Sequence, residues 1–135
     1  MIGTAPENRM GSTISTYSIF PGRSNIQIRT EIDDIILGAN ILSPLGIIIY
    51  ELITNTMKYA FADRNDGVIN VNTRLKDDHL FLVFEDNGCG ISKDVNMDNS
   101  PGFGLQLVRM LIKQINGSLK IESVQGTKFT FKFPV

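Results

Sequence analysis

The chain has 135 residues, of which 42% are hydrophobic and 20% charged, and its formal net charge is -1 at pH 7. These values are typical of one soluble globular domain, and the charge excludes the basic surface of a nucleic-acid-binding protein. A single cysteine excludes an internal disulfide, and no apolar run approaches the roughly 20 residues that cross a bilayer. The start of the chain lacks the pattern of a signal peptide. We therefore expect a cytoplasmic protein with no nucleic-acid partner and no direct membrane contact.

The first part of the chain shows no sustained hydrophobic periodicity. Residues 1–17 are mostly small and polar, and Pro21-Gly22-Arg23-Ser24 is a turn sequence. We therefore expect an N-terminal tail or linker over residues 1–22, followed by one folded domain over residues 23–135.

The next segment predicts a strand followed by a long helix. Apolar residues alternate from Asn25 to Glu31, as they do in a half-buried strand. Ser43 is a good capping residue, and Pro44 after it suits the first position of a helix. We expect this helix to run from there to about Ala60. A polar loop should then occupy residues 62–67.

Two further strands are predicted next. Val68 to Leu75 alternates, Lys76-Asp77-Asp78 is a turn, and Leu80 to Glu85 is an unbroken apolar run. Such a run is typical of a central strand that is buried on both faces. In the first of these strands we expect three side chains to face inward: Ile69, Val71 and Leu75.

The last third of the chain predicts a loop, a helix and a hairpin. Residues 86–101 are rich in Gly, Asn and Asp, and Gly104 to Asn116 is amphipathic with Gly117 as a stop signal. Leu119 to Ser123 and Thr127 to Phe133 alternate around Gly126, as strands of a hairpin do. The predicted fold class is therefore α+β, a two-layer sandwich in which helices cover one face of a sheet.

Three polar side chains share one sector of the first helix. Glu51, Asn55 and Lys58 lie about one turn apart, between apolar neighbours. They form either an ordinary solvated face or a ligand site. Asn is a poor choice for an exposed helix interior, and an amide, a carboxylate and an ammonium together suit a metal ion bound to phosphate oxygens.

Two glycine clusters follow this helix. The sequence DNGCG, Asp86 to Gly90, comes directly after the apolar strand, where glycines form a turn or let a ligand approach the backbone. Gly102 and Gly104 precede the second helix, whose N-terminus can bind an anion. Neither cluster completes a P-loop or a dinucleotide-binding fingerprint.

Taken together and in this order, the motifs resemble those of the catalytic, ATP-binding domain of sensor histidine kinases, in the GHKL superfamily. ELITNTMKYAF is similar to the N-box, DNGCG to the first glycine box, GFGLQLV to the second, and Gly126-Thr127 to the closing G-T. The resemblance covers about Ile26 to Val135. It implies an α/β sandwich of the GHKL (Bergerat) type, with a mixed sheet covered on one face by helices and ATP between the two helices.

The resemblance also implies roles for individual residues. The catalytic pair would be Glu51 and Asn55, with Asn55 coordinating the Mg²⁺ that bridges the ATP phosphates and Glu51 orienting a water or assisting the ion. Asp86 would accept a hydrogen bond from the adenine amine, which Thr127 supports through water. The other nucleotide-binding residues would be Lys58, Tyr59, Gly88, Gly90, Ile91, Gly102, Gly104 and Leu105.

The implied function is binding of Mg-ATP and donation of its γ-phosphoryl group to a histidine on a separate or missing dimerisation domain, and indirectly to a response regulator. His79 is the sole histidine and follows a turn, so we do not expect it to accept phosphate. The lid that the resemblance implies, residues 92–101, is short and has no aromatic residue. Two alternatives stay open: an anti-sigma-factor-type serine kinase, and a regulatory module that binds ATP without transferring phosphate. The hairpin after Gly117 favours the sensor kinase.

Overall fold

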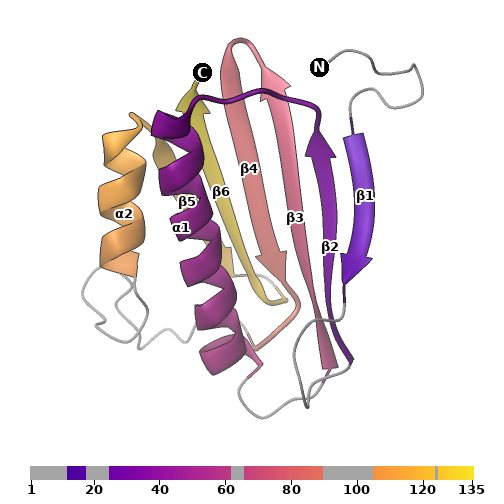
Figure 1. Ribbon diagram of the computed structural model, residues 1–135. Helices are drawn as coiled ribbons and strands as arrows, with labels where there is room; N and C mark the ends of the chain where they lie inside the picture. Colours follow the sequence, from indigo (N-terminus) through magenta and orange to yellow (C-terminus); the bar gives the residue numbers. More distant parts are fainter. Residues whose placement is uncertain (1–11, 18–24, 62–65, 90–104, 124) are drawn as a thin grey trace.

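The computed structural model describes residues 12–17, 25–61, 66–89, 105–123 and 125–135, which build a sheet and two helices packed on it (Figure 1). The sheet is mixed, with strand order β1-β2-β3-β4-β6-β5; β2 and β3 are parallel and the other neighbours antiparallel. The strands are β1 (Ser12–Tyr17), β2 (Asn25–Asp33), β3 (Asp66–Lys76), β4 (His79–Asp86), β5 (Ser118–Ser123) and β6 (Thr127–Pro134).

The helices lie on one face of this sheet. They are α1 (Ala39–Asn55), continued by the π-helical turn η2 (Thr56–Ala60), and α2 (Leu105–Gln114). Parallel neighbours require a crossover connection, and α1 provides it between β2 and β3 (Figure 1). The predicted α+β two-layer fold is confirmed. No helix among the described residues has the length and apolarity needed to cross a membrane.

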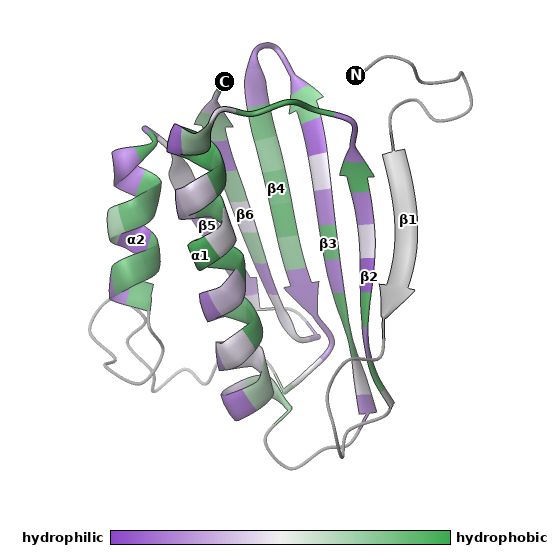
Figure 2. Ribbon diagram, in the orientation of Figure 1, coloured by the Kyte–Doolittle hydropathy of each residue, from purple (hydrophilic) through white to green (hydrophobic). Residues whose placement is uncertain are grey.

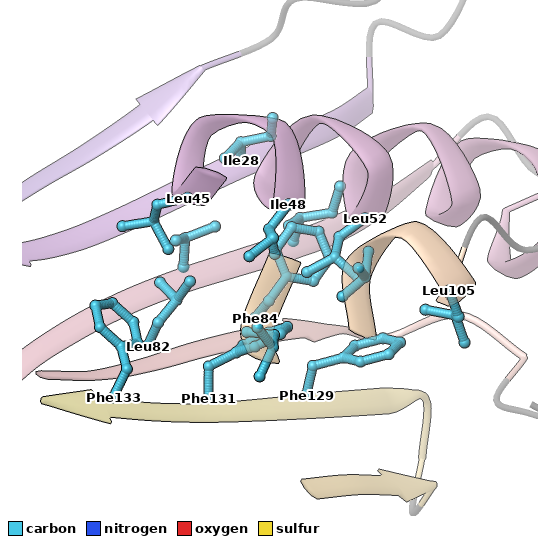
Figure 3. Packing of buried hydrophobic residues seen from close by; sticks show 14 of the residues in the cluster. Ile28, Leu45, Ile48, Leu52, Leu82, Phe84, Leu105, Phe129, Phe131 and Phe133 are labelled. Carbon is cyan, nitrogen blue, oxygen red and sulfur yellow. The ribbon is translucent and has the colours of Figure 1, made fainter. Parts of the chain in front are cut away.

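The core lies between this sheet face and the helices. Three aromatic side chains of β6, Phe129, Phe131 and Phe133, form one buried cluster with Ile48 and Leu52 of α1 (Figure 3). Burying each such side chain contributes about 1.5–3 kcal/mol. This core holds both helices against the sheet.

The other face of the sheet is only partly covered. In β4, Leu80, Leu82 and Phe84 are buried, whereas Phe81 and Val83 on the opposite face are half-buried. Figure 2 shows that β4 is nonetheless hydrophobic along much of its length. The expectation that β4 is buried on both faces was therefore wrong, because the described helices pack against one side only.

The first helix begins earlier than predicted. It starts at Ala39, and the Gly38 carbonyl accepts hydrogen bonds from the backbone N–H groups of Ile41 (3.0 Å) and Leu42 (2.9 Å). Pro44 lies inside the helix and is buried. A proline this close to the N-terminus removes one backbone hydrogen bond, and packing of the apolar residues around it maintains the helix.

The N-terminal expectation also needs correction. Residues 12–17, which we expected to belong to a tail, form β1 and pair in register with β2, from Ser12 opposite Asp33 to Tyr17 opposite Ile28. The expected turn at residues 21–24 lies outside the described residues. The sheet thus extends beyond the expected start of the domain at residue 23.

The remaining strands and the second helix agree with prediction in position, with small differences. β3 begins at Asp66, within the expected loop, and Leu75 near its other end is 48% exposed instead of facing inward. That end of β3 leads into a tight turn at Asp77 and Asp78, both with positive φ, away from the helices. The hairpin of β5 and β6 is confirmed.

Asn116, and not Gly117, is the left-handed residue that ends α2. Its φ is +59°, and its N–H donates to the Lys113 carbonyl while Gly117 N–H donates to the Ile112 carbonyl. These two bonds form a Schellman motif. Gly117 is one residue further on, where a Cβ would lie 3.0 Å from the Lys132 carbonyl oxygen.

Candidate functional site

Asp86 lies at the end of β4, an inner strand of the sheet. Asp86 is the last residue of that strand and lies opposite Ile69 of β3 on one side and Thr127 of β6 on the other. Asp86 is only 4% exposed and Thr127 only 6%, so both are polar residues held at the edge of the core. The two residues that the resemblance assigns to the adenine end are therefore direct cross-strand neighbours.

Gly126 packs directly against the backbone of Asp86. Its φ is +118°, a conformation that residues with a side chain rarely adopt, and a Cβ at this position would overlap the Asp86 carbonyl oxygen. A glycine is required here because two chain segments meet without room for any side chain. The G-T pair of the sequence thus fixes the position of Thr127 beside Asp86.

Gly88 closes a turn on the Asp86 side chain. Its N–H donates to Asp86 Oδ1 at 2.8 Å, the geometry of an Asx-turn. A Cβ on Gly88 would lie 2.5 Å from the Ala60 Cβ and 2.6 Å from the Ala60 carbonyl oxygen. This glycine therefore lets the loop after β4 touch the end of the first helix.

Cys89 joins the same loop to that helix by hydrogen bonds. Its backbone N–H donates to the Ala60 carbonyl at 3.2 Å, and its Sγ donates to the Tyr59 carbonyl at 3.6 Å. Both acceptors are at the end of η2, where helical carbonyls lack partners within the helix. The N-box helix and the first glycine box are thus one connected unit.

The polar stripe of the helix is only partly regular. Glu51 and Asn55 are half-buried and lie one α-helical turn apart, but η2 begins directly after Asn55. A π turn, closed here by Phe61 N–H donating to the Thr56 carbonyl at 2.9 Å, is wider than an α turn. Residues beyond Asn55 are therefore rotated relative to a continuous α-helix, and Lys58 is exposed while Tyr59 is 39% exposed.

Asn55 has an unsatisfied polar group in the part of the chain that the structure describes. Its Nδ2 atom is buried and has no hydrogen-bond partner there. A buried amide without a partner costs free energy, about 1–3 kcal/mol for the whole group, unless a ligand satisfies it. Rotation of the amide by 180° exchanges nitrogen and oxygen, so this side chain suits either a donor or an acceptor ligand.

The donor set fits a magnesium ion carried by phosphates better than a metal held by protein alone. The described residues contain no group of three or more His, Cys, Asp or Glu side chains that could hold a metal. Mg²⁺ usually takes one or two protein oxygens and completes its shell with phosphates and waters. An Asn55 amide oxygen with a nearby Glu51 carboxylate matches that pattern.

The remaining predicted nucleotide-binding residues belong to the second half of the chain. Gly90, Ile91, Gly102 and Gly104 lie outside the described residues. Leu105 is the first residue of α2 and is 1% exposed, and its side chain belongs to the core (Figure 3).

Two residues at the site were missed by sequence reasoning. Ala60 meets Gly88, and Asn87, between Asp86 and Gly88, makes hydrogen bonds to β3 that are described below. The sequence feature that could have indicated the role of Ala60 is its small size on the buried side of the helix, close to the end of that helix. Asn87 had another such feature, since Asn side chains commonly bond to nearby backbone in turns.

Comparison with known proteins gives consistent matches. A family model described as "Histidine kinase-, DNA gyrase B-, and HSP90-like ATPase" matches residues 41–135. The chain is 26% identical over 113 residues to blue-light-activated histidine kinase 2 of Erythrobacter litoralis, a match covering 83% of this chain and 33% of that protein. It is 33% identical over 131 residues to the sensor histidine kinase/phosphatase LytS of Staphylococcus aureus, covering 85% and 21%.

Solved structures give the same result. The histidine kinase domain of the Erythrobacter litoralis EL346 blue-light-activated histidine kinase superposes with a TM-score of 0.76 at 26% identity, covering 84% of this chain and 53% of that one. The mycobacterial sensor histidine kinase MprB, at a TM-score of 0.61 and 21% identity, shows the likeness of fold alone. The chain spans a third or less of the length of these curated relatives.

Proposed function

The chain belongs to the family of histidine kinase-, DNA gyrase B- and HSP90-like ATPases and corresponds to the catalytic ATPase domain of sensor histidine kinases, and from this premise we propose that it binds Mg-ATP and donates the γ-phosphoryl group to a histidine of a phosphoacceptor dimerisation domain. Transfer from that histidine to a response regulator would follow in two-component signalling. We place the domain at residues 23–135, with β1 as an added edge strand.

One observation carries the proposal: the residues assigned to the adenine and to the phosphates belong to one connected unit. Asn55 and Tyr59 are on the helix that ends at Ala60, and Ala60 contacts the loop that follows Asp86. A nucleotide needs both ends of its site at a fixed separation, because phosphoryl transfer depends mainly on positioning.

At the adenine end, we propose that Asp86 selects the base. An ionised carboxylate only accepts hydrogen bonds, and adenine offers an exocyclic amine where guanine offers a carbonyl oxygen. The Gly88 N–H holds Asp86 Oδ1 at 2.8 Å, which restricts rotation of the carboxylate before the base arrives. Thr127, buried beside it, would support the base through water.

At the phosphate end, side chains of the first helix would bind the ion and the phosphates. We propose that Asn55 gives an amide oxygen to the ion, that Glu51 orients a water or assists the ion, and that the exposed Lys58 reaches phosphate oxygens. Bound Mg²⁺ would neutralise charge on the phosphates. Gly90, Ile91, Gly102 and Gly104 stay predicted nucleotide contacts.

The names of the relatives favour histidine over serine as the acceptor. Both curated relatives described above, the Erythrobacter and Staphylococcus proteins, are named histidine kinases. The partner we propose is accordingly a dimerisation domain that presents a histidine in line with the γ-phosphate.

Replacement of Asn55 tests the proposal. Asn55→Ala should abolish the gain in ATP affinity that Mg²⁺ gives, and it should not lower the free energy of unfolding, because the buried Nδ2 of Asn55 has no hydrogen-bond partner within the described residues. Isothermal titration calorimetry with ATP, with and without Mg²⁺, measures this gain. Thr54→Ala is the matched control, since the Thr54 hydroxyl donates only to the Tyr50 carbonyl of its own helix. An unchanged Mg-ATP affinity in folded Asn55→Ala would contradict the proposal.

A further inference from the structure

Asn87, between Asp86 and the first glycine of the glycine box, makes two hydrogen bonds to one residue of β3. Its backbone N–H donates to the Val68 carbonyl at 3.2 Å, and its side-chain Oδ1 accepts from the Val68 N–H at 2.9 Å. The last registered pair of β3 and β4 is Ile69 opposite Asp86, so Val68 and Asn87 are one step beyond it. These bonds therefore form a further rung of the β3–β4 ladder.

This rung differs from a regular one in a single atom. In an antiparallel hydrogen-bonded pair, the two residues exchange backbone N–H and C=O groups in both directions. Here the side-chain oxygen of Asn87 takes the place of its backbone carbonyl. The main chain can consequently leave the ladder at Asn87 while the Val68 N–H stays satisfied.

The turn that follows Asn87 contacts the Asp86 side chain. Directly after Asn87 the chain turns, and the Gly88 N–H donates back to Asp86 Oδ1 at 2.8 Å. Gly88 also packs on Ala60, so its position is fixed from the helix side as well. Without the Asn87 side chain, the turn would keep its contact with Ala60 but lose one of its two hydrogen bonds to Val68 of β3.

We infer that Asn87 is a positioning residue for the nucleotide: its side-chain oxygen replaces a backbone carbonyl in the last rung of the ladder and so holds the Asp86 carboxylate in the orientation that reads the base. The inference rests on the proposed binding of ATP. It assigns Asn87 no contact with the nucleotide. The effect should appear in selectivity between bases as well as in affinity, because the turn that restrains the carboxylate that distinguishes ATP from GTP is held less firmly.

Two variants separate this role from a merely structural one. Asn87→Leu keeps the approximate size but removes the acceptor, and Asn87→Asp keeps an acceptor oxygen in place. We expect Asn87→Leu to bind ATP about three- to tenfold more weakly, as for the loss of one hydrogen bond, and to narrow the ratio of ATP to GTP affinity. Asn87→Asp should keep most of the preference of the unmodified chain for ATP over GTP. Asn72→Leu, the same change elsewhere on β3, is the control and should alter neither quantity.

The measurements are competition of ATP and GTP against a fluorescent ATP analogue, and amide hydrogen exchange of Val68 by NMR. The inference is supported if Asn87→Leu shows both faster exchange of the Val68 amide and a smaller preference for ATP over GTP. Asn87→Asp should then show neither change. An unchanged ratio in Asn87→Leu, or equal losses in both Asn87 variants, would overturn the inference. Failure of the unmodified chain to bind ATP would instead overturn the proposed function, and this inference with it.

Discussion

The two ends of the candidate site are built by different means. At the strand end, Asp86 and Thr127 are positioned by backbone packed against backbone, with Gly126 and Gly88 at contacts where no side chain fits. At the helix end, Asn55 and Lys58 belong to α1 and η2; Lys58 is exposed, and the Nδ2 of Asn55 has no hydrogen-bond partner among the described residues. The strand end therefore ties ligand binding to folding stability, whereas the helix end leaves them independent.

Replacement of Gly126 should do the most damage. Gly126→Ala introduces a Cβ that overlaps the Asp86 carbonyl, at a φ of +118° that alanine rarely adopts. The combined strain should lower the free energy of unfolding by about 3 kcal/mol or more, and ATP binding should be lost with it. Urea denaturation measures the first quantity and calorimetry the second.

Gly46→Ala is the matched control for this change. Gly46 is in α1, and a Cβ there would meet nothing within 4 Å. Alanine is the better helix former, so this variant should be more stable by about 0.5–1 kcal/mol and bind ATP normally. If Gly126→Ala and Gly46→Ala unfolded at the same urea concentration, the close packing at the strand end would be disproved.

The smallest expected effect is at the opposite end of β4. His79 is the first residue of the strand that ends at Asp86, about 23 Å away at roughly 3.3 Å per residue. It is half-buried, and its Nδ1 is 3.0 Å from the Asp77 carbonyl oxygen. His79→Ala should leave ATP binding unchanged, and incubation with γ-labelled ATP should put no acid-labile phosphate on either protein. Label on His79 would contradict the proposed need for a separate acceptor domain.

The sequence predicted most of the fold because hydrophobic periodicity reports burial. The strands of the domain and the second helix appear where alternation or helical spacing placed them. β1 was missed because STISTY carries little apolar alternation, and its strand conformation depends on pairing with β2. The start of α1 was missed because Pro44 is a local signal, which packing of the helix overrides.

The sequence predicted the main residues of the site but not the contacts that connect its segments. Motif resemblance identified Asn55 and Asp86, but the π turn after Asn55 has no sequence signature, so the rotation of Lys58 away from a regular stripe was not foreseen. The contact of Ala60 with Gly88 and the rung made by Asn87 join segments that are distant in sequence. Such contacts follow from tertiary packing, which local patterns do not record.

We propose that the site built on Asp86 binds an adenine nucleotide, and competition between ATP and GTP for the unmodified chain and for Asp86→Asn is the decisive measurement. With GTP, two acceptors would face each other, and each unpaired acceptor costs about 1–3 kcal/mol, so the unmodified chain should prefer ATP by at least about tenfold. Asp86→Asn keeps the shape but can turn a donor toward the base, so it should weaken ATP binding and narrow the difference. Equal affinity of the unmodified chain for ATP and GTP would contradict the claim.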